Sequence, residues 1–343
     1  MKQKKKQKKW QNSELRTLVG AVDIGGTKIA SALFSRSGQR LFASRVQIAG
    51  SGGKEVLEQV ISICYQLLAE AEKRRSCLVA IGLCVPGVVD PGTGFVWAPN
   101  IKGWKNFQLM KRLKKVIPCR LTVISDRTAY VLGESWKGAA RNKKNVVYLA
   151  VGTGIGAGIM AEGLIIHGQS DLAGAVGWMA LTREFKPEYA RCGCFEWEAS
   201  GGAFARKAAE LMASCPEFFP VEKSRPITPA EAVTELCQAA RNGLPQAVEL
   251  VEEIQDYLAM GVANLVSTLN PEVIVFGGGL FQSPDLFFKT LREKFKRWAQ
   301  PLAARQVRLK LSALGQEAAL YGCARAAWMM IDEHGGCCKK EHH

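Results

Sequence analysis

The stretch AVDIGGTKIASALF (residues 21–34) contains an apolar run that stops at Asp23, passes through two glycines and a Thr-Lys pair, and then becomes apolar again. This pattern predicts a strand, a tight turn and a second strand. Because glycine has no Cβ, the backbone N–H groups of such a turn are open to close approach by phosphate oxygens. We therefore expect a phosphate group to bind at this turn, beside the Asp23 carboxylate.

The same pattern returns in YLAVGTGIGAGIMA (148–161), and EVIVFGGGL (272–280) contains a third glycine-rich turn after an apolar run. Two copies of one strand-turn-strand unit, each followed by helical segments, indicate two similar lobes. The predicted fold class is therefore α/β, with two similar lobes and a cleft between them.

The rest of the sequence predicts helices and strands for each lobe, and the boundaries between the lobes. A helix is expected over 53–74, where Val56, Val60, Ile63 and Leu67 recur at helical spacing. Strands are expected in LVAIGLCVP (78–86) and LTVIS (121–125), a helix in RTAYVLGESWKGAA (127–140), and a helix-rich section over 201–266. The predicted boundaries are a disordered basic tail at 1–17, a small lobe formed by 18–124 with 314–334, a large lobe at 125–313, and a disordered end at 335–343.

Composition narrows the class of protein. The chain has 343 residues, of which 48% are hydrophobic, and no uninterrupted apolar run of about 18 residues that would span a membrane. The beginning, MKQKKKQKKW, has six lysines in nine residues and no apolar segment behind them, so it is not a secretory signal. These lysines form either a solvated arm or a contact for a polyanion. Eleven cysteines without a regular framework indicate reduced thiols in the cytoplasm.

Two common phosphate-binding motifs do not fit these turns. A P-loop needs Gly, four residues and Gly-Lys-Ser/Thr, which neither turn has. The dinucleotide fingerprint is matched by Gly152, Gly154 and Ala157, with Asp171 at about the right distance. That fingerprint requires a helix at the turn, however, whereas GIMAEGLIIHG (158–168) predicts strand, turn and strand.

Together these motifs resemble the ROK family of sugar kinases and repressors, within the actin-like ATPase superfold. The resemblance implies that the two α/β lobes are actin-like (ribonuclease H-like). The resemblance covers residues 18–330 in family order. It rests on DIGGTK (23–28), PGVVDPGTG and APNIKGW (within 86–104), SDRTAYVLGESWKGA (125–139), VYLAVGTGIGAGI (147–159), GCFEWEASGG (193–202) and NPEVIVFGGGL (270–280).

The resemblance implies a glucokinase-like transfer of the γ-phosphoryl group of ATP, with Mg²⁺, to a hydroxyl of a hexose or hexose derivative. Asp23 would orient Mg²⁺ through water, and Thr153 would offer its hydroxyl to the γ-phosphate. The implied nucleotide-binding residues are Asp23, Gly25, Gly26, Thr27, Lys28, Gly152, Thr153, Gly154, Gly277, Gly278 and Gly279.

Asp126 matches the family's general base, which takes the proton from the sugar hydroxyl. The alternative is that Asp126 caps the helix that begins there. The residues that the resemblance implies for sugar binding are Asn100, Ser125, Asp126, Trp178 and Glu196, with Ser125 in place of the usual Asn.

The chain departs from the family at two linked motifs. Ala175 and Trp178 replace the usual Glu and His that hold sugar hydroxyls. Of the family's zinc-binding cysteine motif, only Cys194 and Glu196 find counterparts. A Cys192-x-Cys194 pair lacks the four ligands that zinc requires, so we expect no metal site and free thiols. Phe195 and Trp197 are expected to hold this loop by packing. Trp178 either contacts a sugar face or apolar substituent, or packs in the core.

Other functions stay open at this point. A degraded kinase that acts as a sugar or nucleotide sensor is one alternative, and a kinase that uses polyphosphate as donor is another. Family repressors carry a helix-turn-helix of about 60 to 80 residues before the first strand. Only about 17 residues precede that strand here, so we expect no DNA binding and no membrane partner. The resemblance suggests a homodimer or homotetramer.

Overall fold

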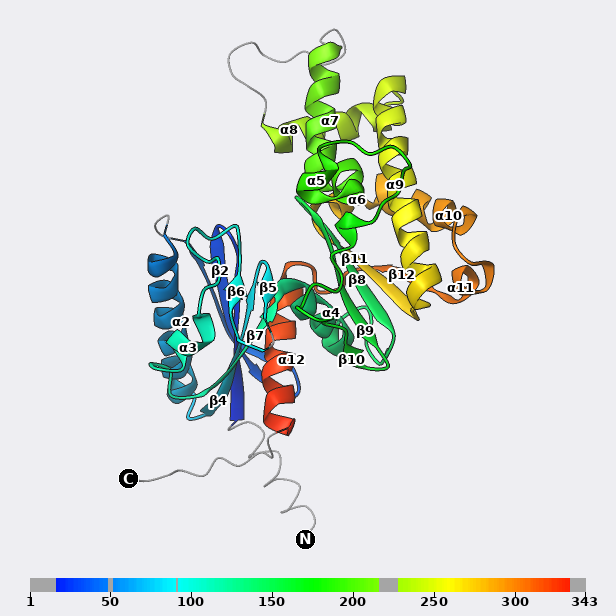
Figure 1. Ribbon diagram of the computed structural model, residues 1–343. Coiled ribbons are helices and arrows are strands. Elements are labelled where there is room, and N and C mark those ends of the chain that lie inside the picture. Colours follow the sequence, from blue (N-terminus) through cyan, green and yellow to red (C-terminus); the bar gives the residue numbers. More distant parts are fainter. Residues whose placement is uncertain (1–16, 49–51, 91, 216–227, 334–343) are drawn as a thin grey trace. The chain divides into compact units, whose positions relative to one another are not determined.

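The structure is a computed structural model that describes residues 17–48, 52–90, 92–215 and 228–333. Its contacts divide the chain into two compact units (Figure 1). Unit 1 consists of Met1–Asn142, His167–Leu172 and Gln316–His343, and unit 2 consists of Lys143–Ile166 and Ala173–Gly315. The tails expected at 1–17 and 335–343 lie outside the described residues, apart from Thr17.

Unit 1 is built on a five-stranded sheet of order β3-β2-β1-β4-β7. Its three N-terminal strands form an antiparallel meander, and β1, β4 and β7 run parallel. Parallel strands end at the same edge of a sheet, so the residues after β1, β4 and β7 lie on one edge. The strands are β1 (Thr17–Ile24), β2 (Lys28–Ser35), β3 (Arg40–Gln47), β4 (Cys77–Val85) and β7 (Arg120–Ser125).

Helices cover both faces of this sheet. The predicted apolar side chains of α2 (Gly53–Lys73) are buried in one core together with residues of α3 (Leu109–Leu113). The opposite face packs against α12 (Ala318–Glu333), which lies along α4 (Asp126–Lys137). A small hairpin, β5 (Val88–Val89) with β6 (Val96–Trp97), follows β4. The turn η4 (Gly315–Glu317) leads from unit 2 into α12.

Unit 2 has a second five-stranded sheet, of order β10-β9-β8-β11-β12. Strands β8 and β9 form the antiparallel pair predicted at the second glycine turn, while β8, β11 and β12 are parallel. The predicted internal repeat is thus confirmed, since each unit begins with a strand-turn-strand pair. The strands are β8 (Val146–Val151), β9 (Ile155–Ala161), β10 (Leu164–Ile165), β11 (Val273–Gly277) and β12 (Arg308–Leu311).

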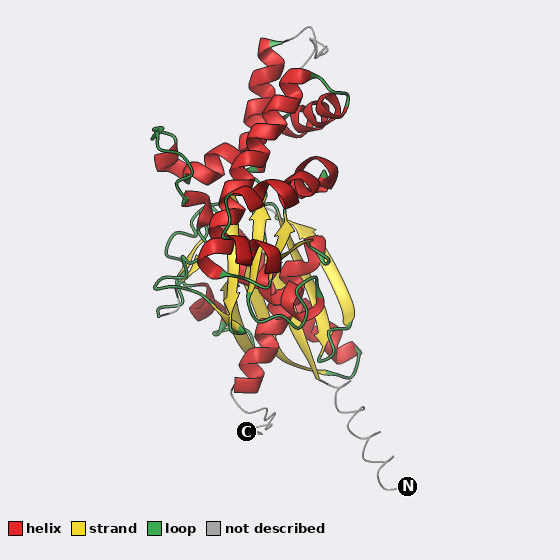
Figure 2. Cartoon of the chain, turned by 90° about the vertical axis from the view of Figure 1, so that its right-hand side faces the viewer, coloured by secondary structure: helices red, strands yellow, loops and turns green. Residues whose placement is uncertain are grey.

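Helices make up most of the rest of unit 2 (Figure 2). The longest, α9, lies in the core with its apolar side chains and contacts α6, α7, α8 and α10. None of the helices within the described ranges is both long and apolar enough to cross a membrane. The helical segments of this unit are η1 (Val176–Trp178), α5 (Tyr189–Cys192), α6 (Cys194–Ala199), α7 (Gly201–Ser214), α8 (Pro229–Arg241), α9 (Pro245–Leu269), η2 (Gly279–Gln282), α10 (Pro284–Lys294), η3 (Phe295–Arg297) and α11 (Pro301–Gln306).

The units differ from the predicted lobes in two places. The boundary expected at 124/125 assigned α4 to the large lobe, whereas α4 belongs to unit 1. The reason is the contact with α12, where glycines let the two backbones touch: a Cβ on Gly322 would lie 1.8 Å from the Ala129 carbonyl oxygen. The segment His167–Leu172 also belongs to unit 1. It is attached there through Asp171, whose carboxylate accepts a hydrogen bond from the Val89 N–H at 3.2 Å.

The α4–α12 contact predicts the effect of Gly322→Ala. Helix propensity alone would favour alanine by about 1 kcal/mol. Because the new methyl group overlaps the backbone of α4, we expect a net loss of about 2 kcal/mol in the free energy of unfolding, measured with urea. Arg325→Ala on the same helix is the control and should change it by less than about 0.5 kcal/mol. A Gly322→Ala protein as stable as wild type would contradict the close packing.

Candidate active site

The unit 1 part of the candidate site lies at the carboxyl edge of its sheet. The strand register places Asp23, Cys84 and Ile124 side by side on β1, β4 and β7. Ser125 and Asp126 follow directly after Ile124, at the junction of β7 and α4. Two carboxylates from distant parts of the sequence therefore come together at one edge, as the parallel pairing requires.

Ser125, and not Asp126, caps helix α4. The Ser125 hydroxyl accepts a hydrogen bond from the Thr128 N–H at 3.4 Å and lies 3.1 Å from the Thr128 hydroxyl. The capping interpretation of Asp126 is therefore wrong. The buried Ser125 side chain is engaged in this cap, so its suggested contact with a sugar stays a prediction.

Asp126 lies half-buried in the first turn of α4, where its Oδ1 accepts the Arg127 N–H at 2.8 Å. Burial raises the pKa of Asp126 to about 6, against the opposing effect of the Arg127 charge. The neighbouring Asp23 carboxylate adds to the increase. A carboxyl group with a pKa near neutrality suits proton transfer, since it is mostly ionised at pH 7 and is a stronger base than an ordinary aspartate.

Asp23 ends β1 beside the first glycine turn. Burial raises the pKa of Asp23, while the Cys84 thiol, which donates to its Oδ1 at 3.2 Å, and the charge of Lys28 lower it. The turn is closed by the Gly25 N–H, which donates to the Lys28 carbonyl at 2.9 Å. A Cβ on Gly26 would lie 3.6 Å from the Cβ of Asn100, so the predicted sugar residue Asn100 neighbours this turn.

In unit 2 the other two glycine turns lie against each other. They follow the adjacent parallel strands β8 and β11. Gly278 has a φ of +99°, and a Cβ there would lie 2.3 Å from the Val151 carbonyl oxygen, so only glycine fits. By contrast, a Cβ on Gly152 or Gly279 would meet nothing within 4 Å. The backbones of the two turns therefore come into close contact at Gly278, while Gly152 and Gly279 face open space.

Helix α7 begins at the Gly152–Gly154 turn. The Gly201 N–H at its N-terminus donates to the Gly152 carbonyl at 2.7 Å, and Ser200 caps the helix by accepting from the Ala203 N–H at 3.0 Å. The N-terminus of a helix attracts anions through its free N–H groups and its dipole. Our sequence analysis assigned no role to Ser200–Gly202; the signal that identifies it is a capping serine followed by two glycines.

Glu196 and Trp178 lie beside the same turn. Glu196 accepts the Ile155 N–H at 2.7 Å, and burial raises its pKa while this hydrogen bond lowers it. A Cβ on Gly177 would lie 3.0 Å from the Cβ of Glu196, so the backbone directly before Trp178 passes this acid. The Trp178 side chain is 57% exposed. The interpretation of Trp178 as a core residue is therefore wrong.

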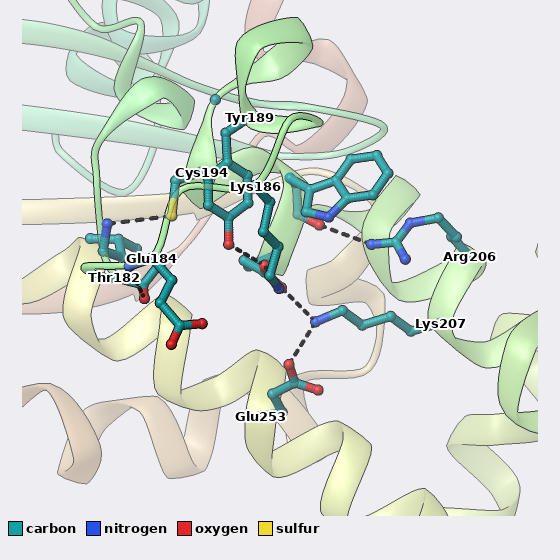
Figure 3. Close-up of polar contacts among 12 residues, drawn as sticks. Thr182, Glu184, Lys186, Tyr189, Cys194, Arg206, Lys207 and Glu253 are labelled. Atoms are coloured by element: carbon teal, nitrogen blue, oxygen red, sulfur yellow. Dashed lines mark hydrogen bonds and ion pairs between the residues drawn. The ribbon is translucent and has the colours of Figure 1, made fainter.

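The loop before α6 is held by an ion-pair network around Glu198. Figure 3 labels Lys186, Tyr189 and Lys207, which bind this carboxylate, and Glu253. The Glu198 carboxylate is 1% exposed and accepts hydrogen bonds from Lys186 at 2.7 Å, from the Tyr189 hydroxyl at 2.5 Å and from Lys207 at 2.9 Å. Lys207 also pairs with Glu253 at 2.8 Å. Burial alone would raise the pKa of Glu198, but the three donors outweigh it and hold the pKa at about 2.

Packing adds to this network, as the sequence analysis expected. Phe195 is fully buried in the core of unit 2, and the Arg206 guanidinium lies 4.0 Å from the centre of the Trp197 ring. The Cys194 sulfur accepts the Leu181 N–H at 3.4 Å. In the described part of the chain, no group of three His, Cys, Asp or Glu side chains is arranged to hold a metal ion. The Glu198 network itself was missed by sequence analysis.

Groups in each unit, taken separately, suit a phosphate ligand, and those of unit 1 also suit magnesium. The open space above Gly152 and Gly279 leaves room for phosphate oxygens at the backbone. Asp23 supplies a carboxylate with Lys28 and Arg45 near enough to lower its pKa. Carboxylates and phosphates are the oxygen ligands, direct or through water, that Mg²⁺ prefers.

Comparison with known proteins matches the chain to the ROK family over residues 19–331. The glucokinase of Halalkalibacterium halodurans is 32% identical over 308 residues, which cover 88% of this chain and 92% of the relative. The xylose repressor of Caldicellulosiruptor bescii is 26% identical over 319 residues, 91% of this chain and 78% of the relative. The crystal structure of a ROK hexokinase from Thermus thermophilus superimposes with a TM-score of 0.79 at 29% identity, covering 92% and 99% of the two chains. The predicted α/β fold class of actin-like lobes is thereby confirmed.

The Glu198 network predicts a pH-dependent loss of stability in Glu198→Gln. The pKa of Glu198 is about 2 in the folded chain and near 4.5 in the unfolded one, so the unfolded state takes up this proton first as pH falls. At pH 7 the substitution should lower the free energy of unfolding by about 2–3 kcal/mol, because it leaves Lys207 with a poorer buried partner. The difference from wild type should shrink as pH falls from about 4.5 toward 2.

Glu210→Gln is the matched control for this experiment. Glu210 is 62% exposed and pairs with Arg206 at 3.2 Å on the surface of α7. Its substitution should change the free energy of unfolding by less than about 0.5 kcal/mol. Equal effects of the two substitutions, or a Glu198 effect that does not depend on pH, would contradict the assignment.

Proposed function

Because the chain belongs to the ROK family, we propose that it transfers a phosphoryl group from ATP to a hydroxyl of a hexose or hexose derivative, with Asp126 as the general base. The observation that carries the proposal is the state of Asp126, half-buried at the carboxyl edge of the sheet with a pKa of about 6. The glucokinase and hexokinase among its relatives support the reaction class.

Asp126 acts by accepting the proton of the attacking hydroxyl. Its carboxylate is oriented by the Arg127 N–H, which holds Oδ1 at 2.8 Å. Arg127 in turn is fixed by a second bond, from its Nη2 to the Asp171 carbonyl at 2.9 Å. A base held in a defined orientation within reach of the hydroxyl contributes about 10²- to 10⁴-fold to such reactions.

Each unit, taken by itself, presents groups that suit the phosphates of the donor. Phosphoryl transfer depends on positioning and on neutralising charge more than on covalent chemistry, and bound Mg²⁺ supplies part of that neutralisation. In unit 1, Asp23 and the Gly25–Lys28 turn serve this role. In unit 2, the Thr153 and Gly154 N–H groups, the Thr153 hydroxyl and the dipole of α7 stabilise negative charge that develops on the phosphoryl oxygens. Gly277–Gly279 border the nucleoside.

The acceptor sugar is bound by a changed set of side chains. Asn100 and Glu196 keep hydrogen-bonding groups, while Ala175 offers none and Trp178 offers an exposed indole. Each hydrogen-bonding partner lost from a site costs about 1–3 kcal/mol for a hydroxyl left unpaired. The exposed indole therefore favours a sugar that presents an apolar face or an apolar substituent over one that presents a hydroxyl at this position.

A sugar sensor without catalysis is the second candidate function, because a xylose repressor is among the relatives. Such a protein needs the binding residues but has no use for a half-buried carboxylate with a raised pKa. Activity that depends on Asp126 separates the two functions.

Asp126→Asn should abolish sugar-dependent ADP formation without unfolding the chain. Turnover with Mg-ATP over a panel of hexoses, N-acetylhexosamines and anhydro-sugars should fall about 10²- to 10⁴-fold, since asparagine accepts no proton. Wild-type kcat/KM should fall as pH drops through about 6, the pKa of Asp126. Asp256→Asn, at an exposed ion pair with Lys294, is the control and should leave turnover unchanged. Wild-type chain that binds sugar without turnover would favour the sensor.

The same variant should be as stable as wild type or more so at pH 7. The folded pKa of about 6 lies above the ordinary value of 3.8, so the stability that protonated Asp126 contributes is lost as pH rises through 6. Asparagine stays neutral and avoids this loss. A thermal unfolding temperature well below that of wild type would show instead that the carboxylate is structural.

Trp178→Ala should weaken binding of the accepted sugar selectively. Removing an indole that contacts a ring is expected to raise KM for the sugar by up to about tenfold, with KM for ATP unchanged. Phe185→Ala is the control, because Phe185 is also an exposed aromatic residue of unit 2, 74% exposed. Equal effects of the two substitutions on sugar KM would contradict the contact.

A further inference from the structure

Unit 2 has a groove of about 710 Å³ along the last strand of its sheet, which we call the β12 groove. Its apolar floor includes Phe295, Ala304, Val307 and Leu309, which are buried or half-buried. The charged side chains that line it come from α10, η3, α11 and β12: they are Arg292, Glu293, Lys296, Arg305, Arg308 and Lys310.

The side chains that line the groove carry an excess of positive charge. Five of its six charged residues are cations, a far higher ratio than the 46 to 31 of the whole chain. Its single carboxylate, Glu293, pairs with Lys296 at 2.9 Å. Among the described residues, no acidic side chain pairs with Arg292, Arg305 or Arg308, and all three are exposed. Like charges gathered in one groove repel each other and attract an anion from solution.

The backbone adds hydrogen-bond donors to this charge. Strand β12 is the end strand of its sheet. The N–H groups of Arg308 and Ser312 donate to β11 and its flank, at the Glu272 and Phe276 carbonyls. Since successive N–H groups of a strand alternate in direction, those of Leu309 and Leu311 face the outer edge. Such donors beside arginine side chains suit an oxyanion.

We propose that the β12 groove binds a short oligophosphate. Arginine presents a planar fork of donors that matches phosphoryl oxygens in pairs. Three arginines that pair with no acidic side chain in the described ranges line this one groove. The volume lies within the range of about 300–1,000 Å³ that is usual for small-ligand sites. None of the lining residues belongs to the glycine turns at 152–154 and 277–279, so the groove is a separate site from the proposed donor site.

The test measures binding of a labelled short inorganic polyphosphate to the full chain by fluorescence anisotropy. All proteins carry serine at the lysines among residues 2–9, which removes the basic run at the start of the chain. Saturating magnesium and a non-hydrolysable ATP analogue occupy the proposed donor site. Arg292→Gln, Arg305→Gln and Arg308→Gln together should weaken binding at least about tenfold and lower the slope of log Kd against log salt by about 2–3.

Two further variants distinguish binding in the β12 groove from nonspecific attraction to positive charge. Lys111→Gln, Lys114→Gln and Lys115→Gln together remove the same three charges from exposed positions of unit 1 and should bind like wild type. Arg292→Lys, Arg305→Lys and Arg308→Lys together keep the charge but lose the fork, and should bind with intermediate affinity. Unlabelled tripolyphosphate and a nucleoside triphosphate, added as competitors, distinguish an inorganic source of the phosphates from a nucleotide source.

Four results would overturn the proposal. One is equal weakening in the groove and unit 1 variants. Another is binding that, without the ATP analogue, is equal in wild type and in the Arg→Gln groove variant and is lost from both when the analogue is added, because the label would then occupy the donor site. A third is equal affinity for polyaspartate or an RNA oligonucleotide of the same charge. The fourth is no binding by the wild-type groove, which would leave the arginines as charges that protect an edge strand from pairing with other chains. Because binding is measured directly, failure of the proposed kinase reaction would not change any of these results.

Discussion

The parallel register of the strands is the constraint on which the candidate site depends. In unit 1 the pairing of β1, β4 and β7 brings Asp23 and the start of α4 to one edge of the sheet. In unit 2 the pairing of β8 and β11 presses two glycine turns together, with Gly278 against the Val151 carbonyl. Backbone hydrogen bonds thus gather groups that lie 100 or more residues apart, and a slip of one residue would turn each of them to the other face.

Two carboxylates show how the fold treats charge in opposite ways. Glu198 is fully buried but receives three hydrogen bonds from Lys186, Tyr189 and Lys207, so its ionised form is stabilised and holds a loop in place. Asp126 is half-buried and has only backbone donors and the neighbouring Arg127 charge against its loss of hydration. Burial therefore destabilises the ionised form of Asp126, whereas the hydrogen bonds to Glu198 outweigh that effect of burial. Such destabilisation is typical of residues retained for chemistry, not for stability.

Sequence analysis correctly predicted elements whose structure is determined by the local pattern of residues. Apolar runs that end in Gly or Asp predicted most strands of both sheets and their glycine turns, but not β12, and the repeat of one motif predicted two similar units. It could not place α4, because the preference of this helix for unit 1 depends on glycines in α12, some 190 positions away. It also missed the Glu198 network, whose donors follow no regular spacing and meet only after α5, α6 and α7 have packed. The choice between Ser125 and Asp126 as the cap needed geometry, since both residue types cap helices.

The altered sugar motif and the loop held by ion pairs are physically connected. Gly193, between α5 and α6, has a φ of +89°, and a Cβ there would lie 2.5 Å from the Cα of Trp178. Glu198, on the next turn of α6, binds Lys186 and Tyr189 just before this glycine. The contacts that hold the loop therefore also hold the backbone that carries the exposed indole. Residue 178 and the ion pairs that anchor the loop therefore act on the same short stretch of backbone. A substitution at one of them limits which substitutions the fold accepts at the other.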